Sequence, residues 1–110
     1  MQYFRSLPKQ QGIAPIDGIR IKEAHLRNVM VTWVELEPGS VLPEHRHPHE
    51  QITVVIEGAM EMTVGVSSML MRKGDAAIVP SDTPHSVRVM ERTIALDAWH
   101  PIRTDYIAAD

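Results

Sequence analysis

The sequence has 110 residues, a formal net charge of −3 and 44% hydrophobic residues, which suits one globular domain. Because it contains no cysteine, it excludes disulfides, thiolate zinc sites and cysteine nucleophiles. No lysine or arginine run is present to attract nucleic acid or an anionic membrane, and no apolar segment approaches the roughly 18 residues of a membrane span, so we expect a cytoplasmic protein with neither partner.

The first eighteen residues predict an irregular or edge segment, because prolines and glycines interrupt any regular pattern there. Beyond them, short segments of apolar and β-branched residues alternate with turn residues. We expect strands over 19–25, 29–37, 51–57, 59–65, 68–73, 76–80, 85–90 and 93–99. No window of helical length has a 3.6-residue period, so residues 1–110 predict a single all-β domain, an antiparallel sandwich or barrel.

Methionine recurs at every second position in two consecutive expected strands. Met60 and Met62 share one face of the first, and Met69 and Met71 repeat the pattern in the second. Thioether sulfurs can bind copper, but methionine with this period more often fills a hydrophobic core. We therefore expect these side chains to be core.

The segment HRHPHEQ, residues 45–51, concentrates side chains that bind metals. His45, His47 and Gln51 share one face of a strand if the backbone stays extended through Pro48. Two imidazoles separated by one residue can reach the same ion. A solvated histidine-rich loop explains the segment alone equally well.

The wider spacing resembles the first motif of the cupin superfamily, G-x5-H-x-H-x3/4-E-x6-G. Gly39, His45, His47, Gln51 and Gly58 occupy its positions, with glutamine where glutamate is usual.

A second segment resembles the second cupin motif, G-x5-P-x-G-x2-H-x3-N. Gly74, Pro80 and His85 match it, whereas Asp82 replaces the glycine and Val89 replaces the asparagine. Both departures leave the ligand histidine in place.

The two motifs cover residues 39–89 and imply a cupin double-stranded β-helix, a jelly-roll-like barrel. The resemblance implies a metal ion bound by His45, His47, Gln51 and His85. Three neutral imidazoles and a neutral amide cancel none of the charge of a divalent transition metal ion, so we expect Lewis-acid rather than dioxygen chemistry. Nickel, manganese, iron, zinc and cobalt all suit such ligands.

A second group of candidate residues lies in LDAWHPIRTDY, residues 96–106. Asp97 shares strand parity with Trp99, so an interior position would desolvate the carboxyl and raise its pKa, which suits acid–base chemistry. Arg103 could fold over the barrel mouth and hold a substrate carboxylate with both arms of its fork. Alternatively, Asp97 faces solvent or forms a structural salt bridge with Arg103.

HPHEQ followed by this tail resembles small single-domain cupins of the pectin-degradation KdgF type, although His100 and Val54 depart from their pattern. The resemblance implies ring opening of a 4,5-unsaturated uronate. Asp97 would transfer the proton and Arg103 would bind the carboxylate. Trp99 and Tyr106 occupy the aromatic positions that line the substrate.

Two other functions remain open from the sequence: a cupin dioxygenase with non-haem iron, and a non-catalytic cupin that binds a small ligand. In each case the partner is a small molecule, here a carboxylate or sugar acid. The family resemblance also implies a homodimer that pairs through barrel edges. We expect His25 and His100 at the surface, His49 near the site and Glu50 pointing away from it.

Overall fold

The computed structural model describes residues 2–108, and within that range the chain forms eight strands and two short 3-10 helices. The strands are β1 (Ile13–Ile16), β2 (Ile19–His25), β3 (Met30–Leu36), β4 (Val41–His45), β5 (Glu50–Val64), β6 (Ser67–Arg72), β7 (Ala76–Val79) and β8 (His85–His100). The helices are η1 (Leu7–Lys9) and η2 (Thr104–Tyr106). All strand pairings are antiparallel, and the predicted all-β, jelly-roll-like fold is confirmed.

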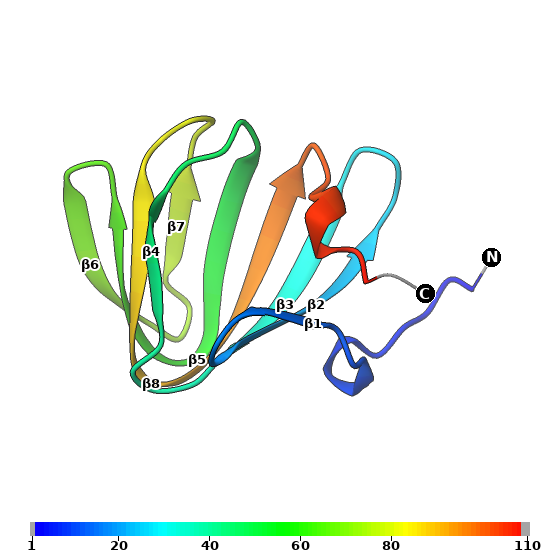
Figure 1. The fold of residues 1–110 in the computed structure, drawn as a ribbon, viewed down its shortest axis with the longest axis horizontal. Coiled ribbons are helices and arrows are strands. Elements are labelled where there is room, and N and C mark those ends of the chain that lie inside the picture. The colour runs from blue at the N-terminus through cyan, green and yellow to red at the C-terminus, as the bar shows by residue number, and fades with distance from the viewer. Residues whose placement is uncertain (1, 109–110) are drawn as a thin grey trace.

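Two long strands, β5 and β8, each belong to both layers of the fold. The first half of β5 (residues 50–57) and the second half of β8 (residues 94–100) lie in the order β1-β2-β3-β8-β5-β7, and the remaining halves lie in the order β4-β8-β5-β6. Figure 1 shows β8 running down one layer in yellow and back up the other in orange. The two layers are therefore joined at the lower end of the view by continuous backbone.

The sequence predicted four separate strands where β5 and β8 run without a break. Gly58 reads as a turn residue, but irregular pairing between Val55 and Met60 lets β5 bend at this point and continue. Gly58 has a φ of 96°, a conformation that glycine adopts readily. Opposite it, the Thr93 hydroxyl lies 2.9 Å from the Glu91 carbonyl oxygen and 3.2 Å from the Ala59 carbonyl oxygen, and so ties the two strands together at the corner.

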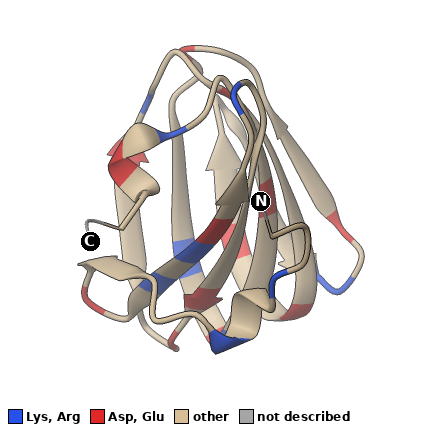
Figure 2. Cartoon of the chain, turned by 90° about the vertical axis from the view of Figure 1, so that its right-hand side faces the viewer, with Lys and Arg blue, Asp and Glu red and all other residues tan. Residues whose placement is uncertain are grey.

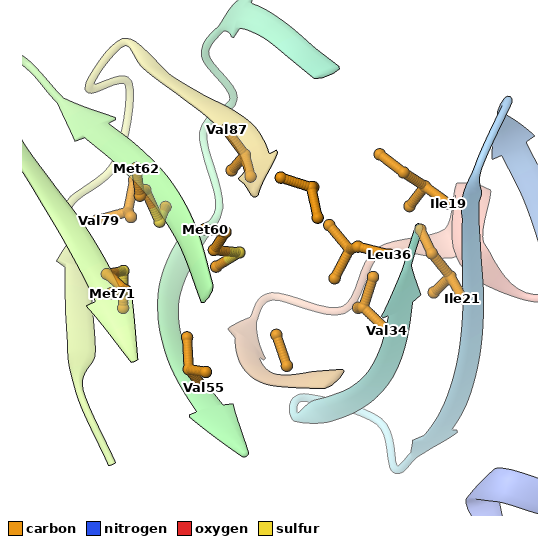
Figure 3. Close-up of a cluster of buried hydrophobic side chains, with 12 residues drawn as sticks. Ile19, Ile21, Val34, Leu36, Val55, Met60, Met62, Met71, Val79 and Val87 are labelled. Atoms are coloured by element: carbon orange, nitrogen blue, oxygen red, sulfur yellow. The ribbon is translucent and has the colours of Figure 1, made fainter. Parts of the chain in front are cut away.

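The hydrophobic core lies between the two layers, where side chains from both meet (Figure 3). Met60, Met62 and Met71 are at most 3% exposed and pack here, as predicted. Met69 was also expected in the core, but it is 53% exposed. Met69 lies nearer than Met71 to the β5–β6 turn, on an edge strand that pairs only with β5, and the layer does not cover it there.

The N-terminal segment packs along the edge of the larger layer. β1 pairs with β2, and the buried Lys22 ammonium donates to the Pro8 carbonyl oxygen at 2.6 Å and to Glu35 at 2.9 Å. Acidic and basic segments are interspersed in the view of Figure 2. None of the helices within residues 2–108 has the length and apolarity needed to span a membrane, and the cytoplasmic location stays a prediction.

Candidate functional site

Three connections meet at one end of the fold, at the top of Figure 1. They are the β4–β5 loop, the β7–β8 loop and the segment that follows β8. The candidate metal ligands and the candidate residues Asp97, Trp99, Arg103 and Tyr106 lie on these connections or near the adjoining strand ends.

Three histidines come together at this end: one ring nitrogen from each of His45, His47 and His85 lies within 4.8 Å of the others. His45 ends β4 and is the register partner of His85, which begins β8. The two are thus on neighbouring strands rather than on opposite sides of the barrel. The backbone is not extended from His45 to Gln51, because β4 ends at His45 and β5 begins at Glu50. The intervening loop, not strand parity, brings His47 into the group.

Backbone carbonyl oxygens orient the three rings. The Nδ1 atoms lie at hydrogen-bond distance from the carbonyl oxygens of Pro43 (His45, 2.8 Å), His49 (His47, 3.1 Å) and Thr83 (His85, 2.8 Å). A carbonyl oxygen only accepts, so Nδ1 carries the hydrogen in each neutral ring. Each Nε2 is therefore left with a lone pair that can bind a metal.

These lone pairs face one another across short distances. Nε2 of His47 lies 3.1 Å from Nε2 of His85 and 3.1 Å from Oε1 of Gln51. With the hydrogens on Nδ1, none of these atoms can donate to another. Three converging lone pairs fit a cation between them, and the donor set matches that of a divalent transition metal.

Burial keeps the inner histidines neutral. His85 is 2% exposed, and loss of hydration lowers its pKa to about 4. Burial, followed by the charge of Arg103, also lowers the pKa of His47. Both imidazoles are therefore available as ligands at neutral pH without losing a proton first.

Asp97 lies inside the barrel, with only 8% of its surface exposed. Its Oδ1 accepts a hydrogen bond from the Thr53 hydroxyl at 2.5 Å, and its Oδ2 accepts one from Thr32 at 3.3 Å. Burial raises its pKa to about 6, even though both hydroxyls favour the ionised form. Asp97 neither faces solvent nor pairs with Arg103, so neither structural alternative from the sequence describes it.

Arg103 lies between two aromatic rings at the cavity mouth. Its guanidinium carbon is 4.8 Å from the Trp99 ring centroid and 4.1 Å from that of Tyr106. Nε and Nη2 donate to the two oxygens of Asp105 at 3.0 and 2.8 Å. Burial would lower the pKa of Arg103, but these bonds outweigh it and the pKa rises.

The fork of Arg103 thus binds Asp105, which corrects the expectation that the whole fork is free for a substrate carboxylate. The free donor is Nη1. This nitrogen is buried and has no hydrogen-bond partner in the protein, and the same is true of Nδ1 of His49. Every other buried side-chain nitrogen or oxygen within residues 2–108 has a partner.

A cavity of about 260 Å³ connects these groups. His45, Gln51, His85, Asp97 and Arg103 contribute to its polar end. Its depth is apolar and is lined by Ile19, Ile21, Val34, Leu36, Met60, Met62 and Val87. The shape suits a small ligand whose polar groups meet the histidine end.

The remaining residues take simpler positions. His25 is exposed and bonds to Glu23 at 2.6 Å, and His100 is exposed, both as expected. Glu50 is exposed as well, at the start of β5. His49 contributes its carbonyl oxygen to the orientation of His47.

Sequence reasoning missed two residues of the site, Thr32 and Asp105. The signals were present: Thr32 has the parity of the buried positions in β3, and Asp105 follows Arg103 by two residues. Their partners depend on strand register and on the path after β8, neither of which the sequence pattern gives.

Residues 32–98 match the family model described as Cupin domain, Cupin_2. The chain is 27% identical over 94 residues to pectin degradation protein KdgF of Dickeya dadantii (strain 3937), which covers 83% of this chain and 86% of that protein. It is similar to the structure of KdgF from Halomonas sp., with 27% identity, a TM-score of 0.90 and coverage of 97% and 100%. An RmlC-like cupin from Shewanella frigidimarina NCIMB 400 shares the fold, at 20% identity, a TM-score of 0.90 and 97% coverage of both chains.

Proposed function

Because the chain belongs to the Cupin_2 family, we propose that it is a metal-dependent enzyme that opens the ring of a 4,5-unsaturated uronate. One observation carries the proposal. A buried carboxyl (Asp97), a guanidinium with a free donor (Arg103) and two of the three histidines (His45 and His85) line a single cavity. The third, His47, lies 3.1 Å from His85, nitrogen to nitrogen. The two KdgF relatives, one of them named for pectin degradation, support the substrate class.

The metal would be held by Nε2 of His45, His47 and His85 and by Oε1 of Gln51. When bound by four neutral groups, a divalent ion keeps its full charge and supplies Lewis acidity toward substrate oxygens. Nickel, manganese, iron, zinc and cobalt all suit this donor set. Elemental analysis of the purified protein distinguishes them.

Arg103 would bind the uronate carboxylate through Nη1. Asp105 holds the other side of the guanidinium, and the rings of Trp99 and Tyr106 keep its plane fixed. The buried Nη1 has no other partner, so a carboxylate that reaches it completes its hydrogen bonding. Trp99 and Tyr106 also line the cavity, where they can contact the sugar ring.

Asp97 would transfer the proton. A 4,5-unsaturated uronate in its cyclic form is a masked enol, and its conversion to the linear ketone needs a proton delivered to carbon and another removed from a hydroxyl. A carboxyl group with a pKa of about 6 holds a proton in part of the molecules near neutral pH and can return to that state after each transfer. The conversion is an isomerisation and needs no oxidant.

We also propose that the protein is a homodimer and that it pairs through the outer face of the larger layer, in place of the barrel-edge pairing that the family resemblance implies. Two adjacent cross-strand rows on this face are apolar from β3 to β7. One row is Val31, Ala98, Ile52 and Ile78, and the other is Trp33, Leu96, Val54 and Ala76. Ile52 and Ile78 are 46% and 72% exposed in the single chain, and a second copy of the same flat face would cover them.

The test uses metal-loaded protein with unsaturated galacturonate or guluronate, and it follows the loss of absorbance of the unsaturated ring. We expect rapid loss with the wild type and little with metal-stripped protein or His85→Ala. His25→Ala is the matched control, because that histidine is exposed and bonds only to Glu23. A wild-type rate equal to that of buffer would rule out this substrate class.

Two other functions share the same cavity. An iron-loaded dioxygenase would consume oxygen with a diketone or catechol-like substrate, although four neutral ligands support higher oxidation states of iron poorly. A non-catalytic binding cupin would bind a uronate without converting it. Calorimetry and an oxygen electrode separate both from the proposed isomerase.

A further inference from the structure

The polar groups beside the histidines form a regular pattern on the inner face of the larger layer. Thr32, Asp97 and Thr53 are register partners in one row across β3, β8 and β5. Gln51 and Trp99 are register partners in the next row toward the cavity mouth. Asp97 therefore has a threonine on each side, and each threonine has a nitrogen donor above it.

The hydroxyl of Thr53 connects Gln51 to Asp97. Its oxygen is 2.5 Å from Oδ1 of Asp97 and 2.8 Å from Nε2 of Gln51. A hydroxyl has one hydrogen, and a carboxylate only accepts. Thr53 therefore donates to Asp97 and has only lone pairs left for position 51.

On the other side of Asp97, the hydrogen bond also runs from a threonine hydroxyl to the carboxylate, and here the donor is certain. The indole Nε1–H of Trp99 can only donate, and it lies 2.9 Å from the Thr32 hydroxyl oxygen. Thr32 must accept there, so its own hydrogen goes to Oδ2 of Asp97. Both threonine hydroxyls thus accept a hydrogen bond from a nitrogen donor and donate one to the carboxylate of Asp97.

Because the Thr53 hydroxyl donates to Asp97, it can only accept from Gln51, and this determines the orientation of the Gln51 amide. Its NH₂ group must face Thr53, which leaves Oε1 facing Nε2 of His47 at 3.1 Å. With the amide reversed, two N–H donors would point at the histidine group and repel a cation. The side chain of Gln51 is only 8% exposed, so water has little access to replace Thr53 as its partner.

We propose that Thr53 is a positioning residue of the metal site: it holds Gln51 with its oxygen toward the histidines and makes position 51 require a hydrogen-bond donor. The inference depends on the proposed metal binding. It also explains why glutamine replaces the glutamate usual at this place in the first cupin motif. With a glutamate at position 51, two carboxylates (that of the glutamate and that of Asp97) would compete for the single hydroxyl hydrogen of Thr53.

The experiment measures metal affinity, not activity, by competition between the protein and a chelating dye for Co²⁺ or Zn²⁺ at pH 7.5. Thr53→Val removes the hydroxyl at nearly constant volume and should weaken metal binding about 10- to 100-fold, the usual effect of losing a group that orients a ligand. Thr53→Ser should restore most of the affinity. Thr32→Val is the matched control, because it removes a hydroxyl from the same carboxylate without touching Gln51 and should leave metal affinity near that of the wild type.

A double-mutant cycle then tests the requirement for a donor at position 51. Thr53→Val should weaken metal binding in the wild type but not in Gln51→Glu, where it removes the competition between two carboxylates. Equal losses in both backgrounds would mean that Thr53 supports the fold only, and would overturn the proposal. If Thr53→Val does not fold, Thr53→Ala replaces it in both backgrounds.

The two proposals fail in different ways. If wild-type protein binds neither ion, the proposed metal-dependent function fails before Thr53 is tested. If the wild type binds metal and Thr53→Val binds it equally well, the function stands and the role of Thr53 is wrong.

Discussion

Burial drives two opposite kinds of titratable group in this cavity toward their neutral forms. It raises the pKa of Asp97 to about 6 and lowers that of His85 to about 4. The permanent charge that acts on both is the guanidinium of Arg103, which Asp105 partly balances. The site can therefore hold a proton on Asp97 near neutral pH while its histidines keep their lone pairs.

The raised pKa of Asp97 predicts how the stability of the metal-free protein depends on pH. Since its pKa is higher in the folded protein (about 6) than in the unfolded chain (3.8), the folded state binds more protons between these values. Its contribution to stability is thus fully present below pH 3.8 and is lost as pH rises through 6. Two units correspond to about 3 kcal/mol.

Comparison with Asp97→Asn isolates this contribution, because the histidines titrate in both proteins. Denaturant unfolding of metal-stripped protein at pH 4, 5, 6 and 7 gives the free energy of unfolding. The wild-type value minus the variant value should fall by about 2 kcal/mol across this range, because part of the full change lies below pH 4. A difference that does not change with pH would show that burial does not raise the pKa of Asp97.

Arg103→Lys tests whether the free donor on the guanidinium binds substrate. An ammonium group cannot hold both oxygens of Asp105, stack between two rings and still present a fixed donor. Loss of one charge-assisted hydrogen bond should raise KM for the unsaturated uronate about 10- to 100-fold, with a smaller effect on kcat. Arg88→Lys is the control, because Arg88 is exposed and its contact with Glu61 is long, at 3.5 Å. Equal KM values in both variants would contradict the role of Arg103.

Among single residues, the resemblance to the cupin motifs predicted which side chains lie together at the site but not which protein groups orient them. His45, Gln51 and His85 line the cavity, and His47 lies 3.1 Å from both Gln51 and His85. The first three ligand positions are close in sequence, so a strand end and a short loop keep them together, whereas His85 was predicted from the second cupin motif. The carbonyl partners of the rings, and the pairing of Arg103 with Asp105, depend on loop conformation, for which the sequence carries no periodic signal.

At the level of strands, the period-2 pattern found six of the eight elements and divided the longest two wrongly. β1 and β4 were not predicted, because each contains a proline, a residue that argues against a strand except at an edge. Gly58 looked like the end of a strand but lies at the corner of β5. A glycine that bends a strand and one that ends it look the same in a single sequence.

The corner at Gly58 predicts an unusually large cost for one methyl group. A Cβ there would lie 2.2 Å from the Arg92 carbonyl oxygen and 2.7 Å from Thr93, whereas one at Gly74 would meet nothing within 4 Å. Both glycines have positive φ, 96° and 89°, so the backbone penalty of alanine is similar at both. Gly58→Ala should therefore lower the free energy of unfolding by about 2 kcal/mol more than Gly74→Ala does, as measured by urea unfolding. Equal losses would mean that the backbone at the corner moves enough to accommodate the methyl group.

At the level of the whole molecule, the family motifs predicted the cupin fold from only part of the chain, residues 39–89. The outer face of the larger layer did not stand out in the sequence. Its two apolar rows combine residues from four strands, β3, β8, β5 and β7, and only the register brings them side by side. Alternation along a single strand shows two faces but not which of them meets a partner.

Ile78→Lys tests whether that face joins two copies. Ile78 ends one apolar row and is 72% exposed, so in a monomer the change should cost little. In a symmetric dimer it places two unpaired ammonium groups in an apolar contact, which should weaken dimerisation about 100-fold or more. Light scattering after size exclusion should give twice 12.4 kDa for the wild type and a value near 12.4 kDa for the variant. Val66→Lys should remain dimeric, because Val66 is fully exposed in the β5–β6 turn, away from both rows; a monomeric wild type, or a variant that stays dimeric, would exclude this face as the interface.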